Sequence, residues 1–377
     1  MGAAAAEPDN RSFSKGYRMI SLVPGASHVS DRVRQALSQA ECPPREDAFA
    51  DLLRRIRLKL LQAFVPGAEA EYTAVLLTGS GVAATEAALL SSVPHGKRAI
   101  VLNNGAGGDR LSSILGVHRL GIGEFTFDWG SRPDLEKIRL ALRQRPEVHV
   151  VAMSHHDVST GALNPIKEIA EVVDSQNRVF VVESISGLGG HELDIAGAHL
   201  YMVAGAPDEC IRGVPGVSFV LVRKGFMERM KGYPQRSWYL HLPHYYENEE
   251  QGAVPFTPAY PVYAAFEAAL EELLEEGVAA RIQRYKQAAG FLRKNLAALK
   301  LAPALPPESY SHTVTSVRLP DGLSYDTLAT RMKDRGYLIA PGLGPFAGKA
   351  FRLAHADLRT PGEMEQLVAA LKDALAR

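Results

Sequence analysis

The sequence has few cysteines, no net charge and no long apolar run. Its two cysteines, Cys42 and Cys210, are too few for a disulfide framework. Lys plus Arg and Asp plus Glu both number 42, so no net positive field favours nucleic acid or an anionic membrane as a partner. No apolar stretch reaches the roughly 18 residues that span a bilayer. We therefore expect a cytoplasmic globular protein whose partner is a small molecule.

The first part of the chain predicts a lead segment followed by a helix. Residues 1–16 are rich in alanine and polar residues, which is typical of a disordered segment. Residues 42–64 place apolar side chains at helical spacing, so we expect one buried helix face. The apolar residues of that face are Phe49, Leu52, Leu53, Ile56, Leu60 and Leu61.

From residue 74 onward, apolar runs alternate with helical segments. The runs are residues 74–78, 98–103, 123–129, 148–153 and 178–183. This order predicts an α/β fold with a mostly parallel central sheet covered on both faces. We expect residues 17–275 to form a large domain with an N-terminal arm, and residues 276–377 to form a linking helix and a small C-terminal α/β domain. Ligands of such sheets bind at the carboxyl ends of the strands.

The segment AGAPDECIRGVPG, residues 204–216, lies between two expected strands, residues 199–203 and 217–222. Its glycines and prolines predict a tightly bent backbone. It resembles the lysine-bearing turn of class V, fold type I aminotransferases, and especially of the 2-aminoethylphosphonate:pyruvate aminotransferases, whose sequence is close to SSANKCIQGVPGF. The ungapped stretches CIRGVPG and GGHELDIAGAH both align Glu209 with the family lysine. A carboxylate cannot form the imine by which that lysine holds pyridoxal phosphate.

Two glycine turns resemble further cofactor contacts of this family. TGSGVAATEAALLS opens a helix whose free N–H groups suit an anion, so Ser80, Gly81 and Val82 are candidate binding residues. The family has threonine where this chain has Val82, and its hydroxyl contacts the cofactor phosphate. In NNGAGGDRL, Gly107 stands where the family has an aromatic ring that stacks on the cofactor.

Two further strand ends supply acidic groups. MSHHDVSTGALNP resembles HCETTTGxLN, so Asp157 stands at the family's glutamate, and His156 beside it is a candidate cavity residue. In VESISGLGG, Glu183 stands where the family has an aspartate that pairs with the pyridine nitrogen. Neighbouring residues on one strand point to opposite faces, so His155 and His156 are poor co-ligands and we predict no metal.

The resemblance also implies an anion anchor and a shared site. FRLAH resembles FRIGN, whose arginine holds the substrate carboxylate, so Arg352 is a candidate binding residue. Thr257 matches a threonine that family members contribute from the neighbouring subunit, which implies a homodimer. The aromatic and apolar residues of the segment before Thr257 also favour an interface. These residues are Trp238, Tyr239, Leu240, Leu242, Tyr245 and Tyr246.

These replacements leave three functions open. We favour an enzyme without cofactor that acts on a small carboxylate or phosphonate, with Glu209 and Glu183 as acid and base and Asp157 and His156 as further catalytic candidates. The second is an enzyme with non-covalent pyridoxal or pyridoxamine phosphate that performs transamination or dehydration. The third is a non-catalytic binding or partner subunit. Loss of the stacking ring and of the phosphate-contacting hydroxyl argues against the second. The retained Arg352 and the new carboxylates argue against the third.

Overall fold

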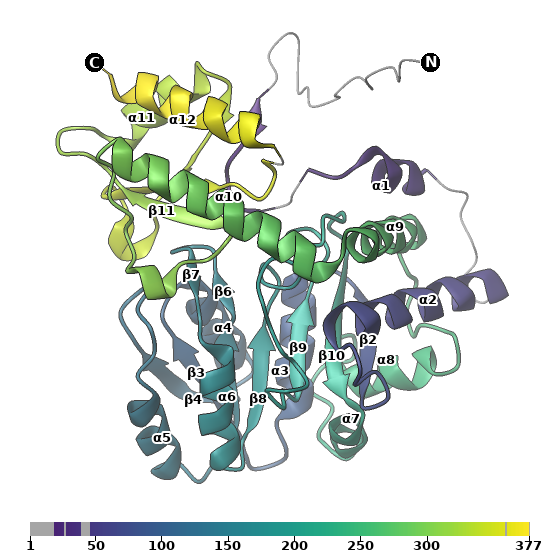
Figure 1. Cartoon of the computed structure of the whole chain (residues 1–377). Coiled ribbons are helices and arrows are strands. Elements are labelled where there is room, and N and C mark those ends of the chain that lie inside the picture. Colours follow the sequence, from purple (N-terminus) through teal and green to yellow (C-terminus); the bar gives the residue numbers. More distant parts are fainter. Residues whose placement is uncertain (1–18, 26–27, 39–45, 359, 377) are drawn as a thin grey trace, which may run out of the picture.

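The computed structural model describes residues 19–25, 28–38, 46–358 and 360–376, so the expected disordered lead and Cys42 lie outside the described residues. A seven-stranded sheet forms the centre of the molecule (Figure 1). Its strands, in spatial order, are β2 (Tyr72–Thr78), β10 (Val217–Arg223), β9 (Met202–Gly205), β8 (Val179–Glu183), β5 (Val148–Ser154), β3 (Arg98–Asn103) and β4 (Gly121–Thr126). All neighbours pair in parallel except β10, which is antiparallel to both of its partners. The predicted fold class is thereby confirmed.

Helices cover both faces of this sheet, because successive strand residues point to opposite sides. In β2, Ala74 and Leu76 join one buried cluster, whereas Val75 and Leu77 join the other. The helices of the first cluster are α2 (Asp47–Phe64), α5 (Leu135–Arg143), α6 (Ile166–Ser175) and α9 (Tyr260–Glu276). Those of the second are α3 (Gly81–Ser92), α4 (Ala106–Val117), α7 (Lys224–Met230) and α8 (Leu242–Glu249).

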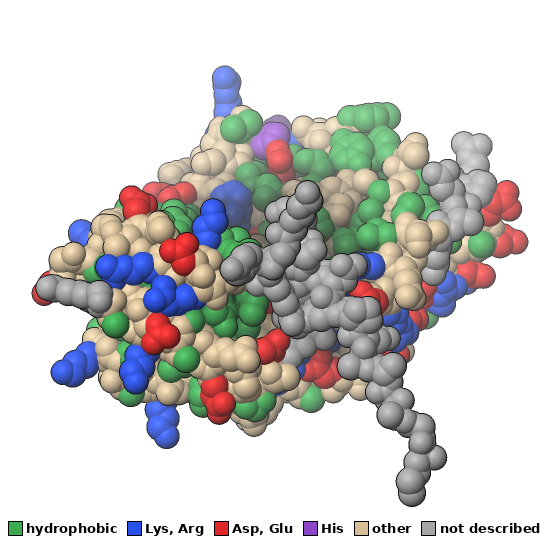
Figure 2. Space-filling view, turned by 90° about the horizontal axis from the view of Figure 1, so that it is seen from above, with side chains coloured by type: hydrophobic (Ala, Val, Ile, Leu, Met, Phe, Trp, Pro, Cys, Tyr) green, Lys and Arg blue, Asp and Glu red, His purple; other side chains and the backbone are tan. Residues whose placement is uncertain are grey.

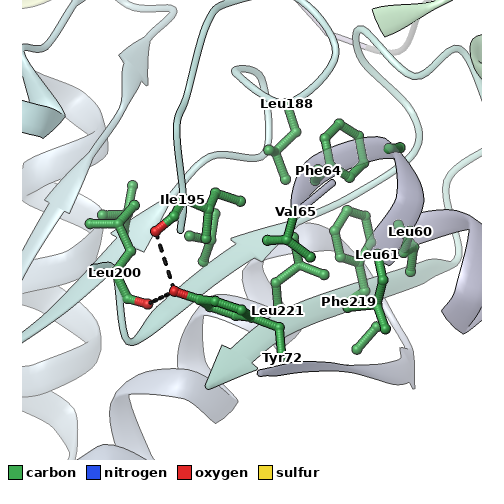
Figure 3. Close-up of a cluster of buried hydrophobic side chains, with 14 of the residues drawn as sticks. Leu60, Leu61, Phe64, Val65, Tyr72, Leu188, Ile195, Leu200, Phe219 and Leu221 are labelled. Atoms are coloured by element: carbon green, nitrogen blue, oxygen red, sulfur yellow. Dashed lines mark hydrogen bonds between the residues drawn. The ribbon is translucent and has the colours of Figure 1, made fainter. Parts of the chain in front are cut away.

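Helix α2 confirms the predicted buried face. The six apolar residues predicted to face inward are all buried, each at most 8% exposed. Figure 3 shows the end of this helix packed on Phe219 and Leu221 of β10, with Tyr72 beside them. The Tyr72 hydroxyl donates to the carbonyl oxygens of Ile195 and Leu200, at 3.3 and 2.9 Å. This contact ties the loop before β9 to the core.

A second, three-stranded sheet lies above the carboxyl ends of the central strands (Figure 1). It contains β11 (Val314–Arg318), β14 (Ala350–Ala354) and β13 (Ala340–Pro341), and it packs with α10 (Val278–Ala298), α11 (Tyr325–Lys333) and α12 (Pro361–Leu375). The arm strand β1 (Ile20–Ser21) pairs in parallel with β12 (Tyr337–Leu338). A short helix, α1 (Asp31–Ala36), and a two-stranded ribbon, β6 (His156–Asp157) with β7 (Ala162–Leu163), complete the parts used below.

Two predicted elements differ in extent. The strand expected over residues 199–203 begins only at Met202, because His199 has φ +52° and its segment forms a turn. The linking helix expected from residue 276 begins at Val278, since Gly277 has φ +84° and separates α10 from α9. Among the described residues, no helix is both long and apolar enough to cross a membrane.

Candidate functional site

The turn that carries Glu209 lies at the carboxyl end of the central sheet, between β9 and β10. The Gly213 N–H donates to the Pro207 carbonyl oxygen at 2.7 Å, which closes the turn. The Gly79 N–H donates to the Gly216 carbonyl oxygen at 2.9 Å. The turn is therefore joined directly to the glycine segment that opens α3.

Glu209 is a partly buried carboxyl group without a partner. Among the described residues, no donor or cation makes a hydrogen bond or ion pair with its side chain. Glu209 and Asp357 both line a cavity of about 30 Å³ between the turn, the arm and the small sheet, which is room for about two water molecules. Loss of solvation, followed by the charges of Asp208, Glu183 and Asp357, raises the Glu209 pKa to about 8. The side chain is therefore mainly protonated at neutral pH.

Glu183, in contrast, is held by three donors. Its Oε2 accepts from the Ser154 hydroxyl and lies 3.2 Å from Nη2 of Arg110. Its Oε1 accepts from the Ile185 N–H at 2.8 Å. These contacts fix the carboxylate at the end of β8.

Asp157 organises the loop around the start of α4. Its Oδ2 accepts from the Gly107 N–H at 2.8 Å, and its Oδ1 accepts from the Ser159 N–H at 2.9 Å. A Cβ atom on Gly107 would lie 2.8 Å from the Ser154 hydroxyl and 3.0 Å from Oδ2 of Asp157. The position of the family's ring is thus no open hollow here, because Ser154 and Asp157 fill the space beside Gly107.

The start of α3 offers backbone donors to an anion. Its N-cap, Ser80, is exposed and its side chain makes no capping hydrogen bond. Helix geometry leaves the first N–H groups, those of Gly81 and Val82, without acceptors in the helix. The Ile185 side chain lies against Gly81, where a Cβ atom would be 2.6 Å from its Cγ1. This contact brings the α3 segment beside Glu183.

Buried histidines line the region below the turn. His156 Nδ1 donates to the Ser186 carbonyl oxygen at 3.1 Å, and the Cys210 thiol donates to the same oxygen at 3.4 Å. His191 Nε2 accepts from the His312 N–H at 3.0 Å. His156 Nε2 and His191 Nδ1 are buried without a partner in the described chain, and the two rings are 4.5 Å apart. In the neutral rings, Nε2 of His156 is an acceptor and Nδ1 of His191 is a donor, so the two nitrogens without a partner are complementary.

His155 and His156, which we expected on opposite faces of one strand, both lie near His191. His155 follows the last residue of β5, where the strand breaks before β6, and its ring is 6.0 Å from that of His191. Burial lowers the pKa of His155 to about 3 and that of His156 to about 4. Both are therefore neutral at pH 7. In the part of the chain that the structure describes, no three potential ligands are grouped to hold a metal ion.

Arg352 reaches the site from β14. It is only 7% exposed, and its Nε and Nη1 donate to the carbonyl oxygens of Pro341 and Val158, at 2.9 and 2.7 Å. Because two of its nitrogens bond to the backbone, Nη2 is the one left for a bound anion. Val158 follows Asp157, so Arg352 lies beside the group formed by Asp157, Gly107, Ser154 and Glu183.

Thr257 is exposed and, within the described parts of the chain, makes no hydrogen bond with this group. Ala259 nearby donates its N–H to the Thr78 hydroxyl of the same chain at 3.4 Å. The aromatic segment before it is divided. Trp238 is 74% exposed, whereas Leu242 and Tyr245 are buried in the chain's own core. Figure 2 shows an area of hydrophobic side chains on the face seen from above. Only part of the segment is therefore free to contact another subunit.

Sequence reasoning missed Arg212, which joins three parts of the molecule. It is 4% exposed and has φ +70°, an unusual conformation for a residue with a side chain. Its Nη2 lies 2.7 Å from Oδ1 of Asp357 and donates to the His28 carbonyl oxygen at 2.8 Å. The turn is thus connected to the arm and to the end of the small sheet. The departure from the family's CIQGVPG at this position was the available signal.

Solved structures share this fold over nearly the whole chain. Alanine–glyoxylate aminotransferase from Nostoc sp. superposes with a TM-score of 0.88 at 23% identity, covering 98% of both chains. A C-DES lysine-to-alanine mutant, which holds glycine covalently linked to its PLP cofactor, superposes with a TM-score of 0.72 at 18% identity. It covers 92% of this chain and 94% of its own. Each confirms the fold type I architecture.

These findings correct one prediction. We expected an enzyme without a cofactor, but the chain aligns with a transaminase over 97% of its length, and a lysine-to-alanine mutant of a protein with this fold holds a PLP cofactor. The cofactor-free prediction is wrong. The relatives and structural neighbours point to pyridoxal phosphate instead, and the predicted alternative of a non-covalently bound cofactor is compatible with them.

The sequence comparisons identify the family. The profile of the Aminotransferase class-V family matches residues 46–343. The 2-aminoethylphosphonate–pyruvate transaminase of Syntrophobacter fumaroxidans is 35% identical over 374 residues, which is 97% of this chain and 99% of that protein. The same enzyme of Klebsiella pneumoniae is 33% identical over 96% of this chain and 98% of its own. The chain therefore belongs to the class V aminotransferase family.

Proposed function

We propose that this protein is a transaminase-class enzyme that binds pyridoxal or pyridoxamine phosphate without a covalent bond to residue 209. Its substrate is a small amine that carries a phosphonate or carboxylate group. The observation that carries the proposal is Glu209, a carboxyl group without a partner among the described residues, in the turn that resembles the family's lysine-bearing turn. The relatives named above, which transfer an amino group from 2-aminoethylphosphonate, support the substrate class.

The residues present fit a phosphate-bearing cofactor at the start of α3. The N–H groups of Gly81 and Val82 and the exposed Ser80 hydroxyl would hold the phosphate, aided by the helix dipole. Glu183, fixed by Ser154 and Arg110, would face the ring nitrogen. When bound, the cofactor supplies an electron sink for the bond that breaks beside the amine. Gly107 adds no stacking ring, so affinity depends mainly on the phosphate and Glu183.

Among the described lysines, none forms an ion pair with the acidic groups of the site. The ion pairs of the described lysines join Glu267, Glu271, Asp134, Glu228 or Glu192, and none joins Glu183, Asp157 or Glu209. A non-covalent complex is consequently the arrangement that these residues support. Its cofactor should exchange with solvent more readily than a covalently attached one.

Glu209 is suited to move a proton. Its raised pKa, about 8, keeps a proton on the carboxyl group at neutral pH, and the adjoining cavity lets solvent replace it. Arg352 would bind the substrate's anionic group through Nη2, a charge-assisted hydrogen bond in a buried position. Glu209 in the turn would thus transfer the proton, and Arg352 on β14 would hold the substrate's anionic group.

We further propose that the enzyme is a homodimer with a site completed by Thr257 of the second subunit. The exposed Trp238 and the exposed Thr257 support this arrangement, because large exposed aromatic residues are favoured at interfaces. Light scattering at micromolar concentration tests the first part. A monomer would rule the dimer out.

Two substitutions at one position test the central proposal. Glu209→Lys should create the covalent attachment that the family uses, so borohydride reduction with pyridoxal phosphate should label residue 209 in peptide maps. The parent protein should bind the cofactor, shown by its absorbance, yet lose it on dialysis and show no labelled lysine. A folded Glu209→Lys protein without label at residue 209 would place this residue outside the cofactor site.

Glu209→Gln tests the proton-transfer role separately. We expect it to retain cofactor affinity within about twofold and to lose at least 100-fold in turnover of 2-aminoethylphosphonate with pyruvate, the range typical of a removed acid–base group. Asp51→Asn, on the exposed face of α2, is the matched control for a lost carboxylate. Parent-like turnover by Glu209→Gln would remove Glu209 from the chemistry.

A further inference from the structure

An open pocket of about 440 Å³ lies at the amino end of the central sheet, away from the site described above. It is lined by Glu71, Tyr201, Arg223, Lys224, Phe226 and Arg229. Because β10 is antiparallel to its neighbours, its last residues lie beside the first residues of β2 and β9. Figure 1 shows α7, which follows β10, at the opposite end of the molecule from α12. The volume is in the range of small-ligand sites.

Backbone hydrogen bonds hold the pocket wall in place. The Arg223 N–H donates to the Tyr201 carbonyl oxygen at 3.0 Å, and the Lys224 N–H donates to the Glu71 carbonyl oxygen at 2.8 Å. Three separate segments are thereby fixed against one another. The side chains that they carry are positioned before any ligand binds, which lowers the entropy cost of binding.

The cations of this pocket outnumber its single carboxylate. Arg223 lies 3.6 Å from Glu71, a long and exposed ion pair. In the described parts of the chain, neither Lys224 nor Arg229 has an ion-pair partner. Arg229 instead lies over the Tyr201 and Phe226 rings, 5.6 and 5.0 Å from their centres. Aromatic contacts hold its guanidinium without neutralising its charge.

The positive potential extends along this edge of the sheet. His149, near the start of β5, has its pKa lowered by burial and then by the charges of Arg229, Arg178 and Lys97. Lys97 and Arg178 directly precede β3 and β8, and Arg229 lies on α7, which follows β10. The three cations therefore lie at the amino end of the sheet, although the whole chain has no net charge. Arg229 of the pocket, and Arg178 and Lys97 outside it, therefore act on the same half-buried histidine ring.

We propose that this pocket binds an oligophosphate anion, either free or as part of a nucleoside polyphosphate. Two or more phosphate groups supply enough negative charge to engage Arg223, Lys224 and Arg229 together, whereas one carboxylate would engage only one of them. The pocket volume leaves room for the base of a nucleotide, which could stack on the guanidinium planes. This inference does not depend on the proposed transaminase activity.

Isothermal titration of the full-length protein at low salt tests the proposal with pyrophosphate, ADP and adenosine. We expect pyrophosphate and ADP to bind and adenosine not to bind. Equal affinities would indicate a site for free oligophosphate, and tighter binding of ADP would indicate a nucleotide site. Affinity should fall at least tenfold in 0.5 M salt, because the contacts are exposed charges. Saturating pyridoxal phosphate should not displace either ligand.

Two charge reversals locate the binding. The double variant Lys224→Glu/Arg229→Glu should lose at least tenfold in affinity for both anions. Lys167→Glu, a single charge reversal at an exposed position on α6 that has no ion-pair partner among the described residues, should stay within twofold. Circular dichroism should show all three proteins folded. Absence of pyrophosphate and ADP binding, or binding unchanged in the double variant, would overturn the proposal.

Discussion

The two ends of the central sheet hold their charged groups in opposite ways. At the carboxyl end, Arg212 and Arg352 are almost completely buried, Glu209 carries a proton, and the histidines below the turn are neutral. At the amino end, Lys224 and Arg229 are exposed to solvent. The charge balance of the whole chain therefore does not predict the charge of a local site. Burial decides which groups keep their charge.

Removing one ion pair at each end of the central sheet tests this contrast with the largest expected effect. Asp357→Asn removes the partner of the buried Arg212 and should cost about 3 kcal/mol of unfolding free energy, since an unpaired buried charge is left behind. Glu71→Gln removes the exposed partner of Arg223 and should cost less than about 0.5 kcal/mol. Urea unfolding of both variants measures the two costs. Similar losses would contradict the contrast.

Acid pH should act through the buried histidines at the carboxyl end. The His155 pKa is about 3 in the folded protein but about 6.5 when unfolded, so below pH 6.5 the unfolded chain binds more protons. Its contribution to stability is present above pH 6.5 and is lost as pH falls. Between pH 7 and pH 5 this loss is about 2 kcal/mol.

The variant His155→Gln separates the contribution of His155 to the pH dependence of stability from that of other titrating groups. The variant should lose about 2 kcal/mol less than the parent between pH 7 and pH 5, because the glutamine cannot bind a proton. Carboxyl groups with raised pKa, such as Glu209 and Glu249, act in the opposite direction but equally in both proteins. His95→Gln, at an exposed position, is the control and should keep the parent's pH dependence. The same dependence in His155→Gln would show that this ring is not neutral when folded.

Close packing at the site is tested by two glycines of α4. Gly107→Ala should destabilise the protein by about 1–3 kcal/mol, because its Cβ atom meets Ser154 and Asp157. Gly116→Ala, in the same helix with no atom within 4 Å of the new Cβ, should stabilise it by roughly 0.5–1 kcal/mol. Thermal unfolding distinguishes the two signs. A stabilising Gly107→Ala would mean that space exists for a ring after all.

Local patterns in the sequence predicted the fold well, because they reflect local physics. Apolar spacing in residues 42–64 predicted the buried face of α2, and alternating strands and helices predicted the sheet. Strand ends were less certain, since the left-handed turn at His199 interrupts an apolar run. The break at Gly277 was equally hidden in a helical pattern.

The site was only partly predictable, because its decisive contacts join distant residues. Glu209 could be singled out from its turn, but its lack of a partner depends on what surrounds it in space. The acid–base role of Glu183 stays a prediction, and its contacts with Ser154 and Arg110 could not be read from the sequence. Arg212 contacts residues 145 and 184 positions away, which no local pattern records.

The smallest expected change in unfolding free energy is at the amino end of the sheet, where an exposed charge can be removed with little effect. Lys224 is exposed and begins α7, so its positive charge lies beside Arg223 and the positive end of the helix dipole. Lys224→Gln removes both repulsions and should stabilise the protein by about 0.3–0.5 kcal/mol in low salt. The gain should disappear in 1 M salt, where the screening length is about 3 Å. A salt-independent loss above about 1 kcal/mol would instead mean that Lys224 is packed or paired, and the amino end would then resemble the carboxyl end.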